Sequence, residues 1–341
     1  MYLTNEFKKA IEAYIAPLSP EEKEVYYRQG EESIAIREQE GLTPETYLNL
    51  IKGIGDYLKA TSGKNFMSEY QRIGITDSIT FYSFQLSGGG NFNIFTTPEG
   101  KMVIDTGYGA YHDDCEKMLK ALGLGGYEDI RSVVCTHGDA DHCGASGYYP
   151  VPPLMHPVTK ALLDSGTRAY GSTSQKLLLE QFYTTSINTM SRMNVPSTVI
   201  ETDTTPIGSR GLFPIIGRVS FAGMEFEIWE SLGGHIAGQL LLYEPRLGML
   251  FTSDAFINFA TLSKERANYC SIADSMIGSV NVDSAIARKE RQELARLFAE
   301  LDTELHTSGR RLLICCGHGA VSMVEGDHLV PASELLKYTA T

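Results

Sequence analysis

The sequence predicts a layered α/β domain preceded by a helical extension. Three observations support this: helical signals dominate residues 1–75, short strands with glycine-rich turns begin near residue 76, and strand–helix alternation then occurs twice. Such alternation is typical of sheets covered by helices. The chain of 341 residues is long enough for two domains, or for one large α/β domain with an appendage. We therefore expect an extension, 1–75, and a second domain, 76–341.

The extension shows helix periodicity and helix starts. Phe7, Ile11 and Ile15 recur at helical spacing. "SPEE" at 19–22 combines an N-cap serine, a proline at the first helical position and a capping-box glutamate, and "TPET" at 43–46 repeats the cap-and-proline signal. No chemical motif occurs here, so we expect a helical cap or an element that forms a homodimer.

The second domain is expected to alternate strands and helices. Residues 157–194 are expected to be largely helical, 258–279 to form a loop, and both segments to shape a pocket. An amphipathic helix is expected over 282–302. The strands begin with "SITFYSFQL", "NFNIFTT" and "KMVIDT"; the helix "HDDCEKMLKAL" and the strand "IRSVVCT" follow, and later strands are "RVSFAGMEFEIWE", "QLLLYEP", "MLFTSD" and "RLLICC".

Composition argues against several classes of partner. The formal net charge is −13 and no Lys/Arg-rich run occurs, so we expect no binding to nucleic acid or anionic membranes. No apolar run approaches the roughly 20 residues that span a bilayer, and the N-terminus lacks the apolar region of a signal peptide. The six cysteines contain no CxxC pair, which favours free thiols and a cytoplasmic location.

Side chains that commonly bind metals follow the ends of several expected strands. The stretch "VVCTHGDADHCGAS" places two histidines and two aspartates within six residues, although the chain has only eight histidines. Later, "GGHIAG", "FTSD" and "CCGHG" each place one such residue beside small residues, where a loop can turn a side chain inward. The candidates are Asp105, His137, Asp139, Asp141, His142, His235, Asp254 and His318.

This order of motifs, over roughly 76–330, resembles the metallo-β-lactamase superfamily, whose pattern is HxHxDH, a later GH, an Asp ending a strand and a final His in a GHG-like loop. The resemblance implies an αββα sandwich and a dinuclear metal-dependent hydrolase. It also implies a hydrogen-bonding role for Asp105 in the loop that presents the ligands. It assigns His137, Asp139 and His235 to the first metal and Asp141, His142 and His318 to the second, with Asp254 as the bridge.

The resemblance also implies a reaction. A hydroxide bridging the two metals would attack an ester, thioester, lactone or amide bond of a small-molecule substrate, while the metals polarise its carbonyl. Asp141 and Asp254 are the expected catalytic residues, with Asp254 assisting proton transfer to the leaving group. Tyr148, Tyr149 and Tyr170 are candidates for lining the pocket.

One residue departs from the family pattern. The usual second histidine is Asp139 here, giving HxDxDH. The additional carboxylate would bring a centre of two divalent ions, three carboxylates and one hydroxide to zero net charge, and so weaken it as a Lewis acid. Zinc is the expected metal, and the oxygen ligand makes iron or manganese plausible.

Three other functions stay open. Flavodiiron proteins also have a carboxylate at the position of Asp139, and a di-iron centre reacting with oxygen or nitric oxide would here need a separate electron donor. DNA-uptake nucleases related to this fold share HxDxDH, but the net charge and "GGHIAG" argue against a phosphodiesterase. A ligand sensor is disfavoured by the complete ligand set. Quorum-signal lactonases usually carry a tyrosine where Ile257 stands, which weakens that assignment.

Overall fold

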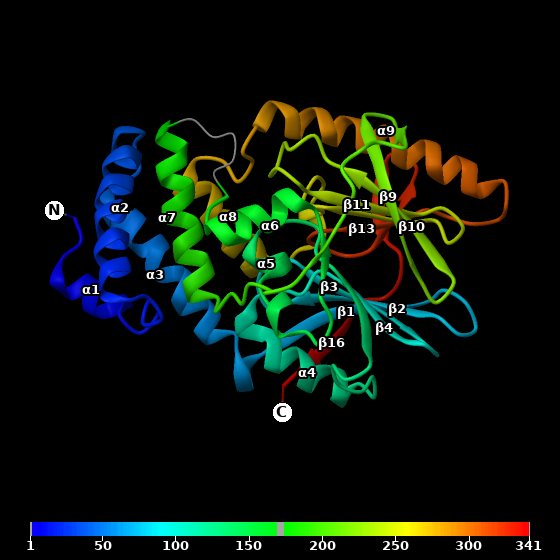
Figure 1. Ribbon diagram of the computed structural model, residues 1–341, viewed down its shortest axis with the longest axis horizontal. Coiled ribbons are helices and arrows are strands. Elements are labelled where there is room, and N and C mark those ends of the chain that lie inside the picture. The colour runs from blue at the N-terminus through cyan, green and yellow to red at the C-terminus, as the bar shows by residue number, and fades with distance from the viewer. Residues whose placement is uncertain (1, 169–173, 341) are drawn as a thin grey trace.

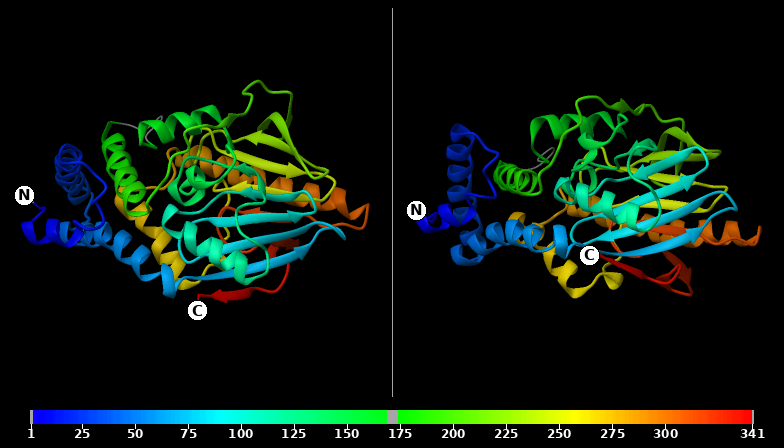
Figure 2. Two further views of the ribbon diagram at one scale, coloured as in Figure 1. Left: turned by 60° about the horizontal axis from the view of Figure 1, so that its bottom comes forward. Right: turned by 90° about the horizontal axis from the view of Figure 1, so that it is seen from below.

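Two eight-stranded sheets stack face to face, and helices cover their outer faces (Figure 1; Figure 2). The structure, a computed structural model, describes residues 2–168 and 174–340. The strand orders are β16-β1-β2-β3-β4-β5-β6-β7 in the first sheet and β15-β14-β13-β12-β11-β10-β9-β8 in the second. This arrangement confirms the predicted αββα sandwich.

The strands of the first sheet are β1 (Met67–Gly74), β2 (Thr80–Leu86), β3 (Asn91–Thr97), β4 (Gly100–Ile104), β5 (Ile130–Val134), β6 (Leu154–Met155), β7 (Ile200–Glu201) and β16 (Leu336–Thr339). Those of the second are β8 (Gly208–Arg210), β9 (Phe213–Phe221), β10 (Met224–Glu230), β11 (Leu240–Glu244), β12 (Met249–Ser253), β13 (Leu313–Cys316), β14 (Ser322–Glu325) and β15 (His328–Pro331).

The α-helices are α1 (Asn5–Ile11), α2 (Pro20–Gln39), α3 (Pro44–Ala60), α4 (His112–Ala121), α5 (Ala140–Cys143), α6 (Pro157–Ser165), α7 (Ser174–Met190), α8 (Lys264–Ile277) and α9 (Ser284–His306). Short 3-10 turns are η1 (Gly63–Asn65), η2 (Gly109–Tyr111), η3 (Ser146–Tyr148) and η4 (Phe259–Thr261). Within the described ranges, no helix is both long and apolar enough to cross a membrane.

Three apolar layers hold the sandwich together. The middle layer lies between the sheets, where the rings of Phe81 and Phe95 are 4.7 Å apart and Phe251 meets Phe81 edge-on at 5.6 Å. A second layer joins the second sheet to α9, and a third joins the first sheet to the remaining helices. Each fully buried phenylalanine stabilises the fold by about 1.5–3 kcal/mol, so the layers hold the sheets and helices together.

The N-terminal helices α2 and α3 pack on α7 and α8. Figure 1 shows α2, α3, α7 and α8 together at one end of the sandwich. The ring of Phe182 in α7 lies 4.9 Å from Tyr26 and 6.3 Å from Tyr47, and all three residues are buried. Ser19 accepts a hydrogen bond from the Glu22 amide, as the capping-box sequence predicts.

The prediction that the whole extension is helical was wrong at its end. Residues 67–74 form β1, which pairs with β2 and β16. The two buried residues of this strand are the polar Ser68 and Gln71, so the apolar alternation that identifies a strand is missing. The Gln71 amide is satisfied by the backbone of Val321 and the Ser333 carbonyl.

The prediction that residues 258–279 form a loop was also wrong, because most of this segment forms α8. Ser263 caps the helix start by accepting from the Arg266 amide, and Gly278 ends it with a left-handed φ of 80°. Both signals are visible in the sequence. The expected helical segment 157–194 forms α6 and α7, apart from the connecting segment and the final residues; 169–173 lie outside the described residues.

Candidate metal centre

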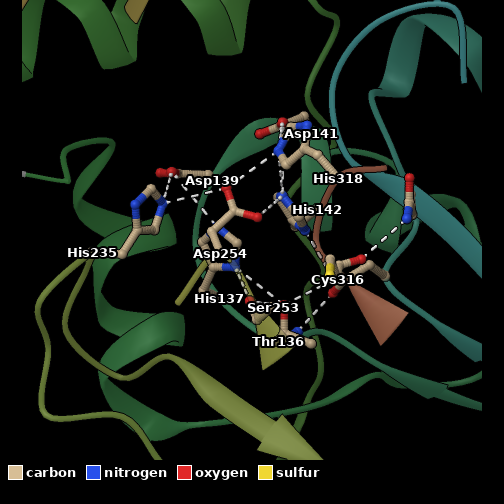
Figure 3. Close-up of polar contacts among 12 residues, drawn as sticks. Thr136, His137, Asp139, Asp141, His142, His235, Ser253, Asp254, Cys316 and His318 are labelled. Carbon is tan, nitrogen blue, oxygen red and sulfur yellow. Dashed lines mark hydrogen bonds and ion pairs between the residues drawn. The ribbon is translucent and has the colours of Figure 1, made fainter. Parts of the chain in front are cut away.

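All seven predicted metal ligands meet in one cluster (Figure 3). Parallel pairing of β4 with β5 and of β12 with β13 brings the ends of these strands together. The loop and short helix after β5 present four of the residues, and the turn between β10 and β11 presents His235. Asp254 follows β12, and His318 follows β13. Segments far apart in the sequence thus converge on one cluster.

The first group consists of His137, Asp139 and His235. Asp139 Oδ2 lies 3.0 Å from Nε2 of His235 and 3.6 Å from Nε2 of His137. Both imidazoles are buried, whereas the Asp139 side chain is 15% exposed and faces the pocket. Two nitrogens and one oxygen therefore converge on a single point.

The second group consists of Asp141, His142 and His318. The Nε2 atoms of the two histidines are 3.4 Å apart. Asp141 Oδ2 lies 3.7 Å from the first of these nitrogens and 3.4 Å from the second. These three atoms form a second convergent set beside the first.

Asp254 lies between the two groups, as Figure 3 shows. Its Oδ2 is 3.6 Å from His235 Nε2 and 3.2 Å from His318 Nε2. Its Oδ1 is 3.2 Å from His142 Nε2. One carboxylate thus contacts both groups.

The spacing fits metal ions. Ligand atoms about 2.0–2.1 Å from a tetrahedral metal are roughly 3.3 Å apart, and the carboxylate–imidazole separations within both groups lie between 3.0 and 3.7 Å. His137 Nε2 is buried without a hydrogen-bond partner among the described residues. A buried polar atom in this state is unfavourable unless an ion or water completes it. The donor set therefore fits two cations.

The charges of the cluster also favour cations. Burial lowers the pKa of His142, but Asp254, Asp141 and Asp105 outweigh it and hold this pKa well above its usual value. At His318 the opposing effect of burial is likewise outweighed, chiefly by Asp254, and the pKa is again well above normal. Carboxylates thus dominate this half of the cluster, and positive charge stabilises it.

Hydroxyl groups set the orientation of His137. Thr136 Oγ donates to Asp105 Oδ2 at 2.8 Å, and Ser253 Oγ donates to Thr136 Oγ at 2.8 Å. The Ser253 oxygen is left as an acceptor for His137 Nδ1, 2.9 Å away. Because that nitrogen then carries the proton, the lone pair of Nε2 faces the cluster.

Asp105 and Ser253 both depart from ordinary backbone geometry. Their φ angles are 60° and 50°, in the left-handed region that few non-glycine residues adopt. Such strain persists only where the surrounding structure enforces it. Here it turns both side chains towards the histidines that they orient.

Two glycines allow the close packing of the cluster. A Cβ at Gly90 would lie 2.6 Å from His142 Cε1, and one at Gly317 would lie 1.9 Å from Asp254 Oδ1. Any side chain at either position would displace a candidate ligand. The turn "SGGGN" at 87–91, which contains Gly90, thus contributes to the site by leaving space for His142.

Arg168 changes the expected charge of the centre. Its buried guanidinium donates from Nε to Asp139 Oδ1 at 2.9 Å and from Nη2 to Oδ2 at 3.0 Å. Burial alone would raise the pKa of Asp139, but the charge of Arg168, with help from His137 and His235, holds it well below its usual value. The zero net charge expected for the centre was counted from three unpaired carboxylates and did not include the positive charge of Arg168.

A cavity of about 110 Å³ adjoins the cluster. Asp139, Asp141, Asp254 and His318 line its polar side. The opposite side is largely apolar and is supplied by α3, α7, α8 and the loops at 257–259 and 280. Its apolar residues are Ile54, Ile187, Ile257, Phe259, Ile272, Ala273 and Val280.

Three tyrosines also line this cavity, namely Tyr108, Tyr183 and Tyr269. Burial raises the pKa of each well above its usual value, so each phenol stays protonated. The tyrosines expected from the sequence lie elsewhere: Tyr148 packs against His112 and Tyr149 against Tyr127, while Tyr170 lies outside the described residues.

Sequence reasoning missed Arg168, Ser253 and the three pocket tyrosines. Arg168 and Tyr183 lie in the insert after β6, where no motif marks them. Ser253 directly precedes Asp254, so its place at a strand end was the one signal available.

The αββα fold and the cluster of candidate metal ligands define a class of protein, and the match to a family model agrees with it. A family model described as "Metallo-beta-lactamase superfamily" matches residues 88–318, which include every candidate ligand. The chain belongs to the metallo-β-lactamase superfamily. No curated protein sequence matches the chain.

The similar solved structures are distant in sequence. "AidC, a Dizinc Quorum-Quenching Lactonase", in complex with a product, is 13% identical over 78% of this chain and 98% of its own, with a TM-score of 0.50. A metallo-β-lactamase from Pontibacter korlensis is 16% identical over 73% of this chain and 91% of its own, with a TM-score of 0.44. Metallo-β-lactamase IND-7 is 12% identical over 74% and 91%, also at 0.44.

Proposed function

We propose that this protein is a dinuclear metal-dependent hydrolase that cleaves an ester, thioester, lactone or amide bond of a small molecule. The observation that carries the proposal is the pair of convergent donor groups joined by Asp254 at the polar side of the pocket. When bound, two metal ions supply a water of lowered pKa and polarise the substrate carbonyl.

The proposed ligands follow the two groups. His137, Asp139 and His235 would hold one ion, and Asp141, His142 and His318 the other, with Asp254 shared; these residues meet within the reach of single ions. Zinc suits the nitrogen-rich set, and the carboxylates leave iron or manganese as alternatives.

The chain's own residues would handle protons and orient the substrate. The carboxylates of Asp141 and Asp254 face the cavity, where they can accept a proton from the attacking water and return it to the leaving group. Tyr108 and Tyr269 line the same cavity as protonated phenols, which can donate hydrogen bonds to an oxygen that gains negative charge.

The lining of the cavity points to an uncharged substrate with an apolar group. Among the described residues that line it, four are aspartates, Asp139, Asp141, Asp254 and Asp274, and none is lysine or arginine. An anionic group on the substrate would therefore lack a partner outside the metal centre. This argument also disfavours a phosphodiester strand, which needs basic contacts along its backbone. Because Ile54 of α3 belongs to this wall, the N-terminal extension would serve as a cap over the pocket.

A matched pair of phenyl esters tests the proposal. Zinc-loaded protein, with no reductase or redox partner, is expected to hydrolyse phenyl hexanoate faster than phenyl hydrogen succinate, and chelation is expected to abolish both activities. Failure to cleave any neutral ester, thioester, lactone or amide would contradict the proposal. Oxygen consumption with a reductase by iron-loaded protein would instead support the di-iron alternative.

A further inference from the structure

The guanidinium of Arg168 is built into the wall of the candidate metal centre. Two of its nitrogens donate to the two oxygens of Asp139 at 2.9 and 3.0 Å, and the residue is only 2% exposed. Such a paired contact uses the planar fork that lysine lacks. It fixes the plane of the Asp139 carboxylate.

The remaining contacts fix Arg168 itself. Nη2 also donates to the Val280 carbonyl at 2.9 Å, and Nη1 lies 3.4 Å from Glu180 Oε2 in α7. The guanidinium is thus held by the loop before α9 and by a pocket helix. Its position does not depend on Asp139 alone.

This arrangement leaves one oxygen of Asp139 for the cluster. Oδ1 accepts from Arg168 Nε, while Oδ2 lies 3.0 Å from His235 Nε2 and 3.6 Å from His137 Nε2. A carboxylate oxygen has two lone pairs, so Oδ2 can accept from Arg168 and still direct its other lone pair towards the point on which the histidine nitrogens converge. Rotation that would present both oxygens to one ion would break the paired contact.

We propose that Asp139 and Arg168 act as one unit that takes the place of the neutral histidine usual in this family. Asp139 supplies one ligand oxygen, and Arg168, a positioning residue, holds that oxygen in place and cancels its charge. The pair has no net charge, as a neutral imidazole has none, so two divalent ions, Asp141, Asp254 and a hydroxide again sum to one positive charge. The inference rests on the proposed dinuclear centre.

If Asp139 and Arg168 act as one unit, each single substitution should weaken zinc binding, and the double substitution should restore it. Removing Arg168 frees the Asp139 carboxylate to rotate away from its ligand position, and this loss of positioning outweighs the attraction of its uncompensated charge for a metal ion. Replacing Asp139 with histidine restores the family ligand but leaves a buried cation beside an incoming metal ion. Replacing both removes the pair and leaves a neutral ligand, so the two losses do not multiply.

Zinc binding to metal-free protein, measured by competition with a chromogenic chelator and by elemental analysis, tests the proposal. Arg168→Met and Asp139→His are each expected to weaken one of the two sites about 10- to 100-fold, the range for lost partners of a metal ligand. The double variant Asp139→His/Arg168→Met is expected to bind two zinc ions with affinities close to wild type. Arg168→Lys, which keeps the charge but loses the fork, is expected to fall between wild type and Arg168→Met.

Arg311→Met is the matched control. Arg311 Nε contacts both oxygens of Asp302 at 3.0 and 3.2 Å, and its Nη2 donates to the Val324 carbonyl, so it too holds an aspartate and a backbone carbonyl, away from the site. This variant is expected to melt at a lower temperature yet to bind two zinc ions as wild type does. Melting curves of every metal-free variant establish folding, and Arg168→Lys replaces Arg168→Met if the latter does not fold.

Unchanged or tighter zinc binding by Arg168→Met would overturn the proposal, as would losses that multiply in the double variant. Should Arg168→Met not fold, wild-type zinc affinity in Arg168→Lys would overturn it. Wild-type protein that binds two ions but hydrolyses no acyl compound contradicts the proposed function alone. Two-ion binding in wild type with independent effects of the variants contradicts the Asp139–Arg168 unit alone.

Discussion

Asp105 accepts a hydrogen bond from His142 Nδ1 across 2.9 Å, and this one carboxylate orients histidines of both ligand groups. It acts on His142 directly and on His137 through the hydroxyls of Thr136 and Ser253. Since the proton on each Nδ1 leaves the Nε2 lone pair for the cluster, the two groups depend on a common anchor.

Asp105→Asn tests that anchor. Asparagine keeps the shape and tolerates the left-handed backbone at this position, but it offers only one acceptor oxygen for the donors around it. We expect zinc affinity at both sites to fall about 10- to 100-fold in chelator competition. Asp129→Asn, which removes a carboxylate that pairs with Lys101 elsewhere, is the control and should bind zinc normally. An equal effect of the two substitutions would contradict the common anchor.

Gly317→Ala is expected to prevent dinuclear binding by steric contact alone. The new Cβ would lie 1.9 Å from Asp254 Oδ1 and close to the Ser253 backbone, so Asp254 must move from its place between the groups. We expect elemental analysis to find less than two equivalents of metal. Gly74→Ala, where no atom lies within 4 Å of the added Cβ, should retain both ions. Two tightly bound ions in the first variant would contradict the bridging position of Asp254.

Metal uptake is expected to release protons. Although burial opposes it, facing carboxylates hold the pKa values of His142 and His318 well above their usual value in the metal-free protein, so both imidazoles bind protons near neutral pH. A metal ion must displace those protons, and zinc affinity should therefore rise with pH across the neutral range. Titration calorimetry in two buffers of different ionisation enthalpy measures the protons released. A count of zero, with affinity independent of pH, would disagree with this charge balance.

Ile187→Ala tests the apolar wall of the pocket. The side chain is 6% exposed and lines the cavity, so its loss should reduce kcat/KM for phenyl hexanoate about tenfold while leaving phenyl acetate nearly unchanged. Leu177→Ala, on an exposed position of the same helix, should alter neither ester. Equal losses for both esters in Ile187→Ala would show that the wall does not contact the acyl chain.

The sequence predicted the layered α/β domain because its strands and helix starts are local signals, and the resemblance to the superfamily implied the sandwich. The glycine-rich turns, the runs of β-branched and aromatic residues, and the cap at Ser19 all appear where the structure has them. The failures have a physical cause as well. β1 buries Ser68 and Gln71 instead of apolar residues, and α8 has a weak apolar periodicity despite its Ser263 cap and Gly278 terminator.

The candidate site was predictable where ligands directly follow strands. His137, His235, Asp254 and His318 lie beside short apolar runs, and the structure brings them together. Arg168 was not predictable, because it lies 29 positions after Asp139, in a segment after α6 that carries no motif. The charge at a site depends on such distant partners, and for that reason the neutral centre expected from the sequence was incomplete.

The most direct test of the central claim is the metal content and metal positions of protein purified without added metal. Elemental analysis combined with anomalous diffraction should find two ions per chain, one beside His235 and one beside His318, with Asp254 between them. Protein with no metal, or with ions bound outside this cluster, would contradict the account.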